Sequence, residues 1–262
     1  MRHAVAAVLI FSPLTSAPLP AQDAAGLVPL GQAARERRDP RVAIEHYRAA
    51  LALDSTVYTA HWELALSLID LGSDTPDPVR SPRRDSLYAE AERHARRAVE
   101  LEPDSANGWF ALANAMGRAS LTMGNRERVR RAAEIRDAAR RAVEIDPAHD
   151  GAWHVLGRWH AEIRRLSGVQ RFLARAFLGG GILSEASWDS ATAQLERAVA
   201  LEPRRIFHRL DLAEVYIDRK RYADARRELE AVAELPVADY GDERHQRAAA
   251  ALLERIAGRQ DG

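Results

Sequence analysis

Apolar residues recur every three or four positions along most of the chain, the spacing that gathers them on one side of an α-helix. Four of these amphipathic stretches end in a related phrase, in which Leu or Ile precedes an acidic residue and then Pro or Ser. The phrases are Leu51–Ser55, Val99–Pro103, Val143–Pro147 and Val199–Pro203. Because proline does not continue a helix, the three prolines each predict the end of one helix and a turn into the next.

A second pattern follows these phrases and sets large residues at fixed offsets. The matching strings are Trp109-x2-Leu112-Ala113-x2-Met116, Trp153-x2-Leu156-Gly157-x2-His160 and Leu212-Ala213-x2-Tyr216. They resemble the tetratricopeptide signature of Trp, Leu-Gly and Tyr at fixed offsets. In the second helix of a repeat, the signature continues with an alanine followed four residues later by a large residue. Small residues at such positions let two helices approach closely, while the large ones fill the space between them.

The chain is therefore expected to be all-α, a tetratricopeptide-like α-solenoid of about five antiparallel helix pairs plus a C-terminal capping helix. We expect the pairs at 24–54, 57–101, 105–145, 150–201 and 206–235, and the cap at 242–257. The phrases lie further apart than the roughly 34 residues of a plain repeat. Insertions are therefore predicted near 72–86 and 165–187.

The first residues have the layout of a secretory signal peptide. Arg2 and His3 precede the apolar run Ala4–Phe11, and prolines and small residues follow. The run is well short of the roughly 20 residues that span a bilayer, so a cleaved leader is favoured over a short membrane anchor. We therefore expect a signal peptide at 1–23, a single repeat domain at 24–262 without a transmembrane segment, and a periplasmic or secreted location.

Composition narrows the classes of partner and chemistry. The 38 basic and 38 acidic residues cancel, so no overall field attracts nucleic acid. The arginine-rich segment 126–141 is interrupted by acidic residues and carries an apolar side, which is typical of a solvated helix. The absence of cysteine excludes disulfides, thiol nucleophiles and thiolate metal sites.

No string typical of a catalytic or cofactor site occurs. The phosphate-binding glycine motifs and the Gly-x-Ser-x-Gly elbow are absent. His154 and His160 are six residues apart and fall on different sides of a helix, so a metal site is not expected, and His160 is interpreted as a core residue. We expect no enzyme and no cofactor; an enzyme with an unrecognised site is the third alternative.

One stretch has a more specific resemblance. It carries the phrases Gly151-Ala-Trp-His-Val-Leu-Gly-Arg-Trp-His160 and Leu201-Glu-Pro-Arg-Arg-Ile-Phe-His208, joined by a long connection with the triplet Gly179–Gly181. From about residue 61 to 222, the chain resembles the regulator of microtubule dynamics family. The resemblance implies a helical repeat fold without catalytic residues, used as an interaction surface and in some members as a lipid-binding cavity.

Candidate binding residues follow from the register of the repeat, because the first helix of each pair lines the concave side. The residues one place after the Trp position are Trp62, Phe110, His154 and Leu210. One turn further lie Leu66, Asn114, Arg158 and Glu214, with Asn107, Arg118 and Glu162 nearby. The aromatic rings predict a row suited to an apolar peptide or acyl chain. The alternative is that this row is core packing.

Arg118 and Arg158 are the candidates for binding an anion, because a guanidinium can fork onto a carboxylate or phosphate. The alternative for Arg158 is an internal ion pair with Glu162 or Asp211. The leading hypothesis is an exported, non-enzymatic scaffold that binds a protein or peptide segment in its concave groove. The alternative is a carrier of a lipid or other amphiphile, which requires an enclosed apolar tunnel rather than a groove of mixed polarity.

Overall fold

The computed structural model describes residues 23–76, 79–121, 123–168 and 184–261. In these residues the chain forms helices and no strand. The helices are α1 (Ala24–Glu36), α2 (Pro40–Leu53), α3 (Tyr58–Gly72), α4 (Pro82–Leu101), α5 (Ala106–Leu121), α6 (Asn125–Ile145), α7 (Asp150–Arg165), α10 (Trp188–Leu201), α11 (Ile206–Asp218), α12 (Tyr222–Glu234) and α13 (Asp242–Arg255). The all-α prediction is confirmed.

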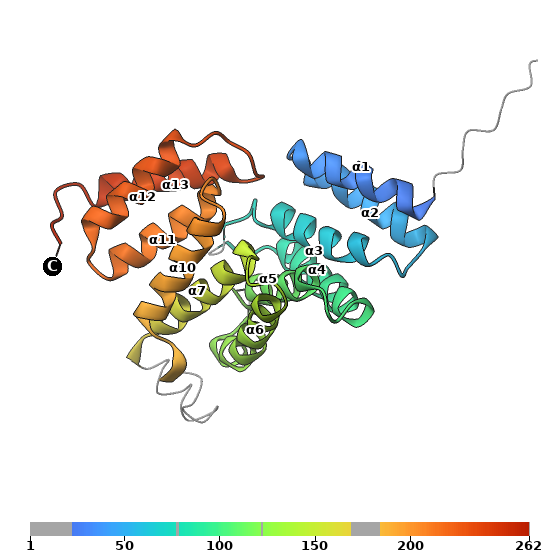
Figure 1. Cartoon of the computed structure of the whole chain (residues 1–262), viewed down its shortest axis with the longest axis horizontal. Coiled ribbons are helices and arrows are strands. Elements are labelled where there is room, and N and C mark those ends of the chain that lie inside the picture. The colour runs from blue at the N-terminus through green and yellow to red at the C-terminus, as the bar shows by residue number, and fades with distance from the viewer. Residues whose placement is uncertain (1–22, 77–78, 122, 169–183, 262) are drawn as a thin grey trace, which may run out of the picture.

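Successive helices pack as pairs in chain order. The pairs are α1–α2, α3–α4, α5–α6, α7–α10 and α11–α12, and α13 packs on α11 and α12. Figure 1 shows these pairs following one another around a curve, with the N-terminal and C-terminal pairs on opposite sides of it. The prediction of five pairs and a capping helix is confirmed, and the expected boundaries agree with the structure to within a few residues.

The turns before α3, α5, α7 and α11 repeat one side-chain contact to a backbone carbonyl. Trp109 Nε1 donates to the carbonyl oxygen of Pro103 at 2.8 Å, and Trp153 Nε1 donates to that of Pro147 at 2.9 Å. The other copies contain different side chains in the same geometry. His61 Nε2 lies 3.1 Å from the carbonyl oxygen of Ser55, and Arg209 Nε donates to that of Pro203 at 2.8 Å. The phrase and the residue six places after it therefore act together to fix each turn.

Glycines at the pair interfaces make room for large side chains of the second helix. A Cβ added to Gly31 or Gly72 would lie only 2.4 Å or 2.5 Å from the ring of Tyr47 or Tyr88. Both tyrosines are fully buried. A Cβ on Gly157 of α7 would lie 2.6 Å from Cγ of Leu195 on α10. These contacts are the close approach that the small positions of the repeat predict.

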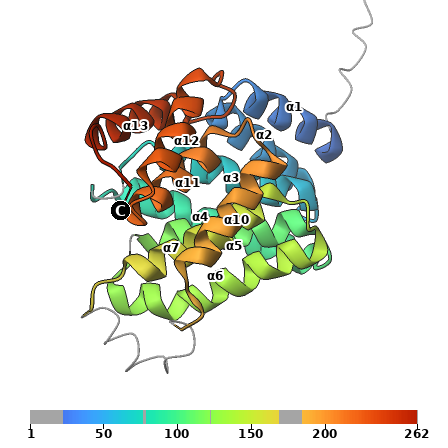
Figure 2. The ribbon, with the colours of Figure 1, turned by 60° about the vertical axis from the view of Figure 1, so that its left-hand side comes forward.

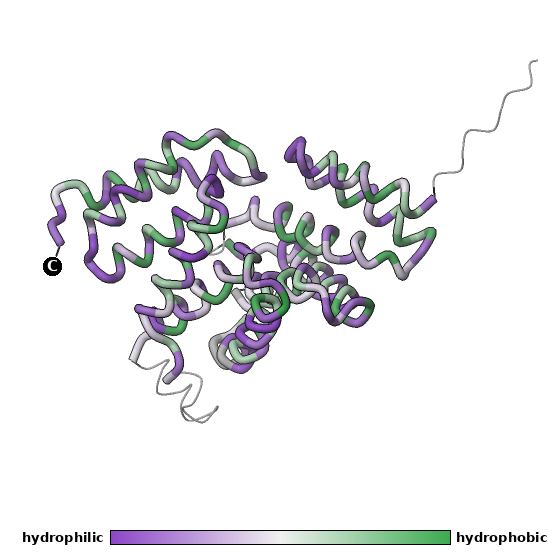
Figure 3. Tube along the Cα trace, in the orientation of Figure 1, coloured by the Kyte–Doolittle hydropathy of each residue, from purple (hydrophilic) through white to green (hydrophobic). Residues whose placement is uncertain are grey.

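The core follows the curve of the array. One cluster of buried side chains extends from Leu27 in α1 to Ala186, just before α10, and a second extends from Ala161 to Ile256. Figure 2 shows the stacked helices from another side, and Figure 3 shows hydrophobic positions recurring at intervals along each helix. None of the helices in the described ranges combines the length and the apolar character that crossing a membrane requires.

The C-terminal part of the array contacts its N-terminal half. Tyr240 Oη, in the loop between α12 and α13, donates to Asp74 Oδ1 at 2.7 Å. Arg244 of α13 donates to Ser73 Oγ at 2.8 Å. Ser73 and Asp74, which directly follow α3, belong to the insertion predicted near 72–86, and its residues from Pro82 onward begin α4. Most of the insertion predicted near 165–187, with its glycine triplet, lies outside the described residues.

Candidate functional site

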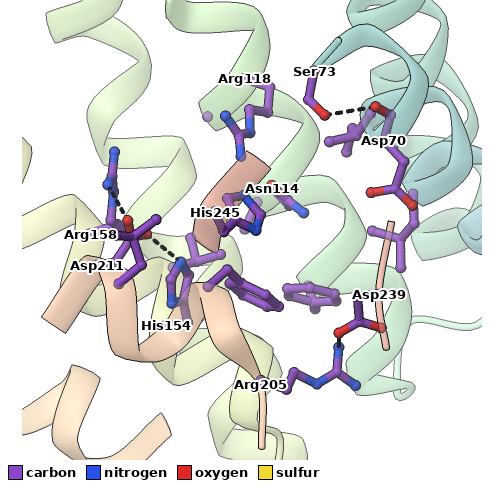
Figure 4. A pocket seen from close by; sticks show the side chains of 18 of the residues that line it. Asp70, Ser73, Asn114, Arg118, His154, Arg158, Arg205, Asp211, Asp239 and His245 are labelled. Carbon is purple, nitrogen blue, oxygen red and sulfur yellow. Dashed lines mark hydrogen bonds and ion pairs between the residues drawn. The ribbon is translucent and has the colours of Figure 1, made fainter. Parts of the chain in front are cut away.

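The inner side of the curve contains a cavity of about 1130 Å³. The first helices of all five pairs, α1, α3, α5, α7 and α11, contribute to its lining, together with parts of α6. The loop from Ala238 to Tyr240 and the start of α13 complete it. In Figure 4 the labelled side chains, which come from α3, α5, α7, α11, α13 and the adjoining turns, surround a shared space. The cavity is therefore a product of the whole array rather than of one repeat.

Nine of the eleven predicted binding residues line this cavity. They are Leu66 on α3, Phe110, Asn114 and Arg118 on α5, His154, Arg158 and Glu162 on α7, and Leu210 and Glu214 on α11. The register of the repeat thus brings together side chains that lie almost 150 positions apart in sequence. That they bind a ligand remains a prediction.

Trp62 and Asn107 are not among the lining residues, which corrects their expected placement. Trp62 packs against the first hydrophobic cluster, so the row of aromatic rings does not extend to α3 along the cavity. Asn107 lies in the first turn of α5, where its Oδ1 is 3.2 Å from Nε2 of His149. Both side chains are thereby used in contacts within the fold.

Arg158 forms an internal ion cluster. Its guanidinium lies 2.8 Å from Asp211, 3.3 Å from Glu162 and 3.5 Å from Glu214. Asp211 raises the pKa of Arg158 above its usual range. Burial opposes ionisation of Asp211, but the charge of Arg158 and a hydrogen bond from His154 outweigh it and hold the pKa of Asp211 below its usual range. The ion-pair alternative for Arg158 therefore describes the structure.

A chain of hydrogen bonds joins this cluster to the start of α11. His154 Nε2 lies 3.0 Å from Asp211, the Nδ1 atoms of His154 and His208 are 3.0 Å apart, and His208 Nε2 lies 2.8 Å from Asp150. Burial is the main cause that lowers the pKa of His208, to about 4. Ionised carboxylates only accept hydrogen bonds, so Nε2 of each ring donates to its carboxylate. The chain fixes α7 against α11 on this side of the cavity.

A second ion cluster lies on the N-terminal side. Arg35 of α1 pairs with Glu63 and lies 3.6 Å from Asp70, both on α3. Gln32 Nε2 donates to Glu63 at 3.4 Å. Burial raises the pKa of Asp70, against the opposing charge of Arg35. The lining therefore combines paired charges from both halves of the array with apolar side chains such as Leu66 and Phe207.

Comparison with known proteins agrees with this architecture. Residues 31–257 match the model of the family described as regulator of microtubule dynamics protein 1-3. The chain belongs to this family. The match runs from within α1 to the end of α13, so it extends well beyond the stretch that carries the resemblance in the sequence. No curated protein matches this member of the regulator of microtubule dynamics family.

Solved structures with a similar fold include a tetratricopeptide-type protein. TTC0263, a thermophilic protein of Thermus thermophilus, is 21% identical with a TM-score of 0.61, and the alignment covers 88% of this chain and 99% of that chain. PilF of Pseudomonas aeruginosa is 14% identical with a TM-score of 0.51, and the alignment covers 89% and 91% of the two chains. At these identities the likeness concerns the fold.

Several residues that line the cavity of this family member were not predicted from the sequence. Phe207 is the second residue of α11, and its ring centre lies 4.9 Å from that of His154. Tyr240, Arg244 and His245 come from the loop and helix that follow the last pair. The family-like phrase ending at His208 could have indicated Phe207. The C-terminal residues carry no repeat signal, because they lie beyond the last helix pair.

The described residues contain no group of three or more His, Cys, Asp or Glu side chains arranged to hold a metal ion. The two carboxylates nearest to the histidine pair, Asp150 and Asp211, are each held by an arginine as well. What the cavity offers is instead hydrogen-bonding and apolar contact along a strip of α5, α7 and α11.

Proposed function

We propose that this chain is a non-enzymatic repeat scaffold that binds a peptide segment of a partner protein in the cavity. The observation that carries the proposal is that the first helices of all five pairs contribute to one cavity with a mixed lining. Its volume of about 1130 Å³ exceeds the roughly 300–1,000 Å³ typical of small-molecule sites. A peptide supplies both the apolar and the polar groups that such a lining matches.

The polarity of the lining favours a peptide over an acyl chain. Arg158 and its carboxylate partners lie beside the apolar residues Val155 and Leu210, and all of them line the cavity. An acyl chain over this surface would remove water from charged groups without replacing its hydrogen bonds. A peptide backbone replaces them. Native mass spectrometry of the chain purified without detergent tests this choice: stoichiometric bound lipid would contradict the proposal.

A matched pair of leucine variants tests the cavity as the binding surface. A display library of random octapeptides with free C-termini is panned against the full chain, and the strongest binder is titrated by fluorescence anisotropy. Leu66 lines the cavity, whereas Leu53 at the end of α2 is 60% exposed and lies outside it. We expect Leu66→Ala to weaken binding about tenfold and Leu53→Ala to leave it unchanged.

The result is interpreted only for variants whose helical circular dichroism equals that of the parent chain. Equal affinity of the parent chain and Leu66→Ala for every selected peptide would overturn the cavity as the binding surface. A second cleft lies between α4, α5 and α6, and Trp109 contributes to its lining. Weaker peptide binding to a variant changed at Trp109 would then place the binding surface at this cleft.

We also propose that the protein acts in the periplasm or outside the cell. The layout of residues 1–23 supports this, and α1 begins at Ala24, so removal of the leader leaves every described helix complete. Expression of the full chain in a Gram-negative host, followed by intact-mass analysis of the periplasmic fraction, tests the proposal. We expect a mature N-terminus between Ala17 and Ala24; a full-length cytoplasmic product would contradict it.

A further inference from the structure

The two hydrophobic clusters of the core meet at α7. Trp159 of this helix belongs to the first cluster, whereas Ala161 belongs to the second, together with Leu210 of α11. On the cavity side, α7 and α11 are joined by polar side chains, with His154 and His208 at the centre. How α11 lies against α7, and with it α12 and α13, therefore depends in part on these two rings.

The two rings face each other through their Nδ1 atoms. Each Nε2 donates to a carboxylate, His154 to Asp211 and His208 to Asp150. The Nδ1 atoms, 3.0 Å apart, can then form a hydrogen bond only when one proton lies between them. With no proton there, two lone pairs face each other, and with two protons, two N–H groups do. The contact is thus strongest when the pair holds one proton more than two neutral rings.

Burial makes this proton count matter for the fold. His208 is fully buried, and the side chain of His154 is 12% exposed. If Nδ1 of His208 loses its partner, water cannot replace it, and an unpaired polar atom weakens the contact that buries it. Burial, aided by the charge of His154, lowers the pKa of His208 to about 4. The second proton therefore binds to the pair as the pH falls toward that value.

Charged side chains around the pair govern its protonation. Asp150 and Asp211 favour a positively charged ring, while Arg205 and Arg158, which pair with them, oppose it. The other charged or titratable groups nearby are Arg118 on α5, Glu162 on α7, Glu214 on α11, Asp239 in the loop before α13 and His245 on α13. A first proton is thus matched by two carboxylates, whereas a second places two positive rings 3.0 Å apart.

We propose that His154 and His208 form a pH-sensitive junction, which holds α7 against α11 while the rings share one proton and releases it when they hold none or two. Figure 4 shows His154 and Asp211 joined at the wall of the cavity. Release lets α11, α12 and α13 move together, because the second cluster packs them on one another. The loop with Tyr240 moves with them, away from Asp74. The junction thus opens the cavity at one side, and it requires no ligand.

A second histidine pair with similar geometry provides a control. Nδ1 of His61 on α3 lies 3.0 Å from Nδ1 of His94 on α4. Nε2 of His61 donates to the carbonyl oxygen of Ser55, whereas Nε2 of His94 is 3.9 Å from Glu90, too far for a hydrogen bond. Two neutral rings satisfy this arrangement, because His94 can donate through Nδ1. This pair joins the two helices of one repeat and lies outside the cavity.

Distances between spin labels on opposite sides of the array test the proposal. The chain contains no cysteine, so labels attach only to introduced ones, at the exposed positions Glu45→Cys in α2 and Glu254→Cys in α13. Double electron–electron resonance of the full chain measures their separation across about pH 4 to 9. We expect a bell-shaped profile of closure. The ratio of open to closed molecules is lowest where the rings share one proton and rises about tenfold on either side, the effect of losing one hydrogen bond to a charged group. Labels at Glu45→Cys and Glu100→Cys, both in the N-terminal half, should keep one distance throughout.

His154→Asn should abolish the pH dependence. The asparagine amide reaches the place of Nδ1 and can present either its N–H or its oxygen to His208. It therefore stays bonded whether His208 is neutral or charged, and Asp211 keeps its ion pair with Arg158. We expect this variant to remain closed over the whole range. His94→Asn makes the same change in the control pair and should leave the bell-shaped profile as it is in the parent chain.

A label distance that stays constant across the pH range would overturn the proposal, as would equal profiles of the parent chain and His154→Asn. Circular dichroism at each pH separates opening from unfolding, because opening keeps the helical signal. Where acid unfolds the chain, the alkaline half of the profile decides the question on its own. None of these measurements needs a peptide. A failure of the junction therefore leaves the proposed function standing, and a failure of peptide binding leaves the junction standing.

Discussion

At the scale of single residues, the repeat register predicted where side chains point better than what they contact. Arg118 on α5 and Arg158 on α7 both line the cavity. Only Arg158 meets carboxylates, because α11 supplies Asp211 and Glu214 against it. These partners are more than 50 residues away in sequence. Periodicity fixes the side of a helix, but it does not specify which side chain of the next pair lies opposite.

Buried histidines make the stability of the fold depend on pH. His160 of α7 is 5% exposed and packs on Trp159, as its interpretation as a core residue requires. Burial, together with the charge of Arg140, lowers its pKa to about 4. The folded state therefore binds the proton less readily than the unfolded chain, whose histidine pKa is about 6.5. Its contribution is present above pH 6.5 and is lost as the pH falls toward 4.

We expect the free energy of unfolding to decrease between pH 6.5 and pH 4, by on the order of 1 kcal/mol per pH unit for His160. His94 and His208 act in the same direction, because burial lowers the pKa of each to about 4. Urea denaturation across this range measures the decrease. His160→Gln should make it shallower, and an identical slope in this variant would contradict the assignment.

At the scale of helices, the pairing was predictable because its causes are local. The prolines of the repeated phrases end helices, and Asp39 and Ser81 cap α2 and α4 immediately before Pro40 and Pro82. Gly157 illustrates the limit of such arguments. A glycine within a helix weakens that helix. The close contact with Leu195 on α10 explains why this position is nevertheless a glycine.

A comparison of Gly157→Ala with Gly117→Ala tests whether close packing explains the glycine at position 157. A Cβ on Gly157 would lie 3.1 Å from the carbonyl oxygen of Ala191 as well as close to Leu195, so α7 and α10 must separate. We expect Gly157→Ala to lower the free energy of unfolding by about 1–3 kcal/mol. A Cβ on Gly117 of α5 would meet nothing within 4 Å. Gly117→Ala should stabilise the chain by about 0.5–1 kcal/mol; similar effects of both changes in urea denaturation would refute the close-packing argument.

At the scale of the whole molecule, the cavity depends on closure between the ends of the array. The contact of Tyr240 with Asp74 joins residues 166 positions apart. No repeat pattern encodes such a contact, because it depends on the accumulated curvature of all the intervening pairs. The sequence therefore predicted a concave side and most of its side chains, but not the loop that bounds the cavity.

Closure predicts a specific change in the exchange of backbone amides. Tyr240→Phe removes the hydrogen bond to Asp74 and keeps the ring. We expect amides in residues 237–241 to exchange about fivefold faster, which corresponds to the loss of roughly 1 kcal/mol, while amides within α12 retain their rates. Hydrogen–deuterium exchange with mass spectrometry measures this. Unchanged rates in the loop would show that this hydrogen bond does not hold it.

The central claim is that the cavity between the first helices binds a partner peptide. Hydrogen–deuterium exchange of the full chain, with and without the strongest display-selected peptide, tests it most directly. The account predicts slower exchange in α3, α5, α7 and α11 and in the loop before α13, with α2, α4 and α12 unaffected. Protection confined to the outer helices, or centred on the cleft between α4 and α6, would contradict it.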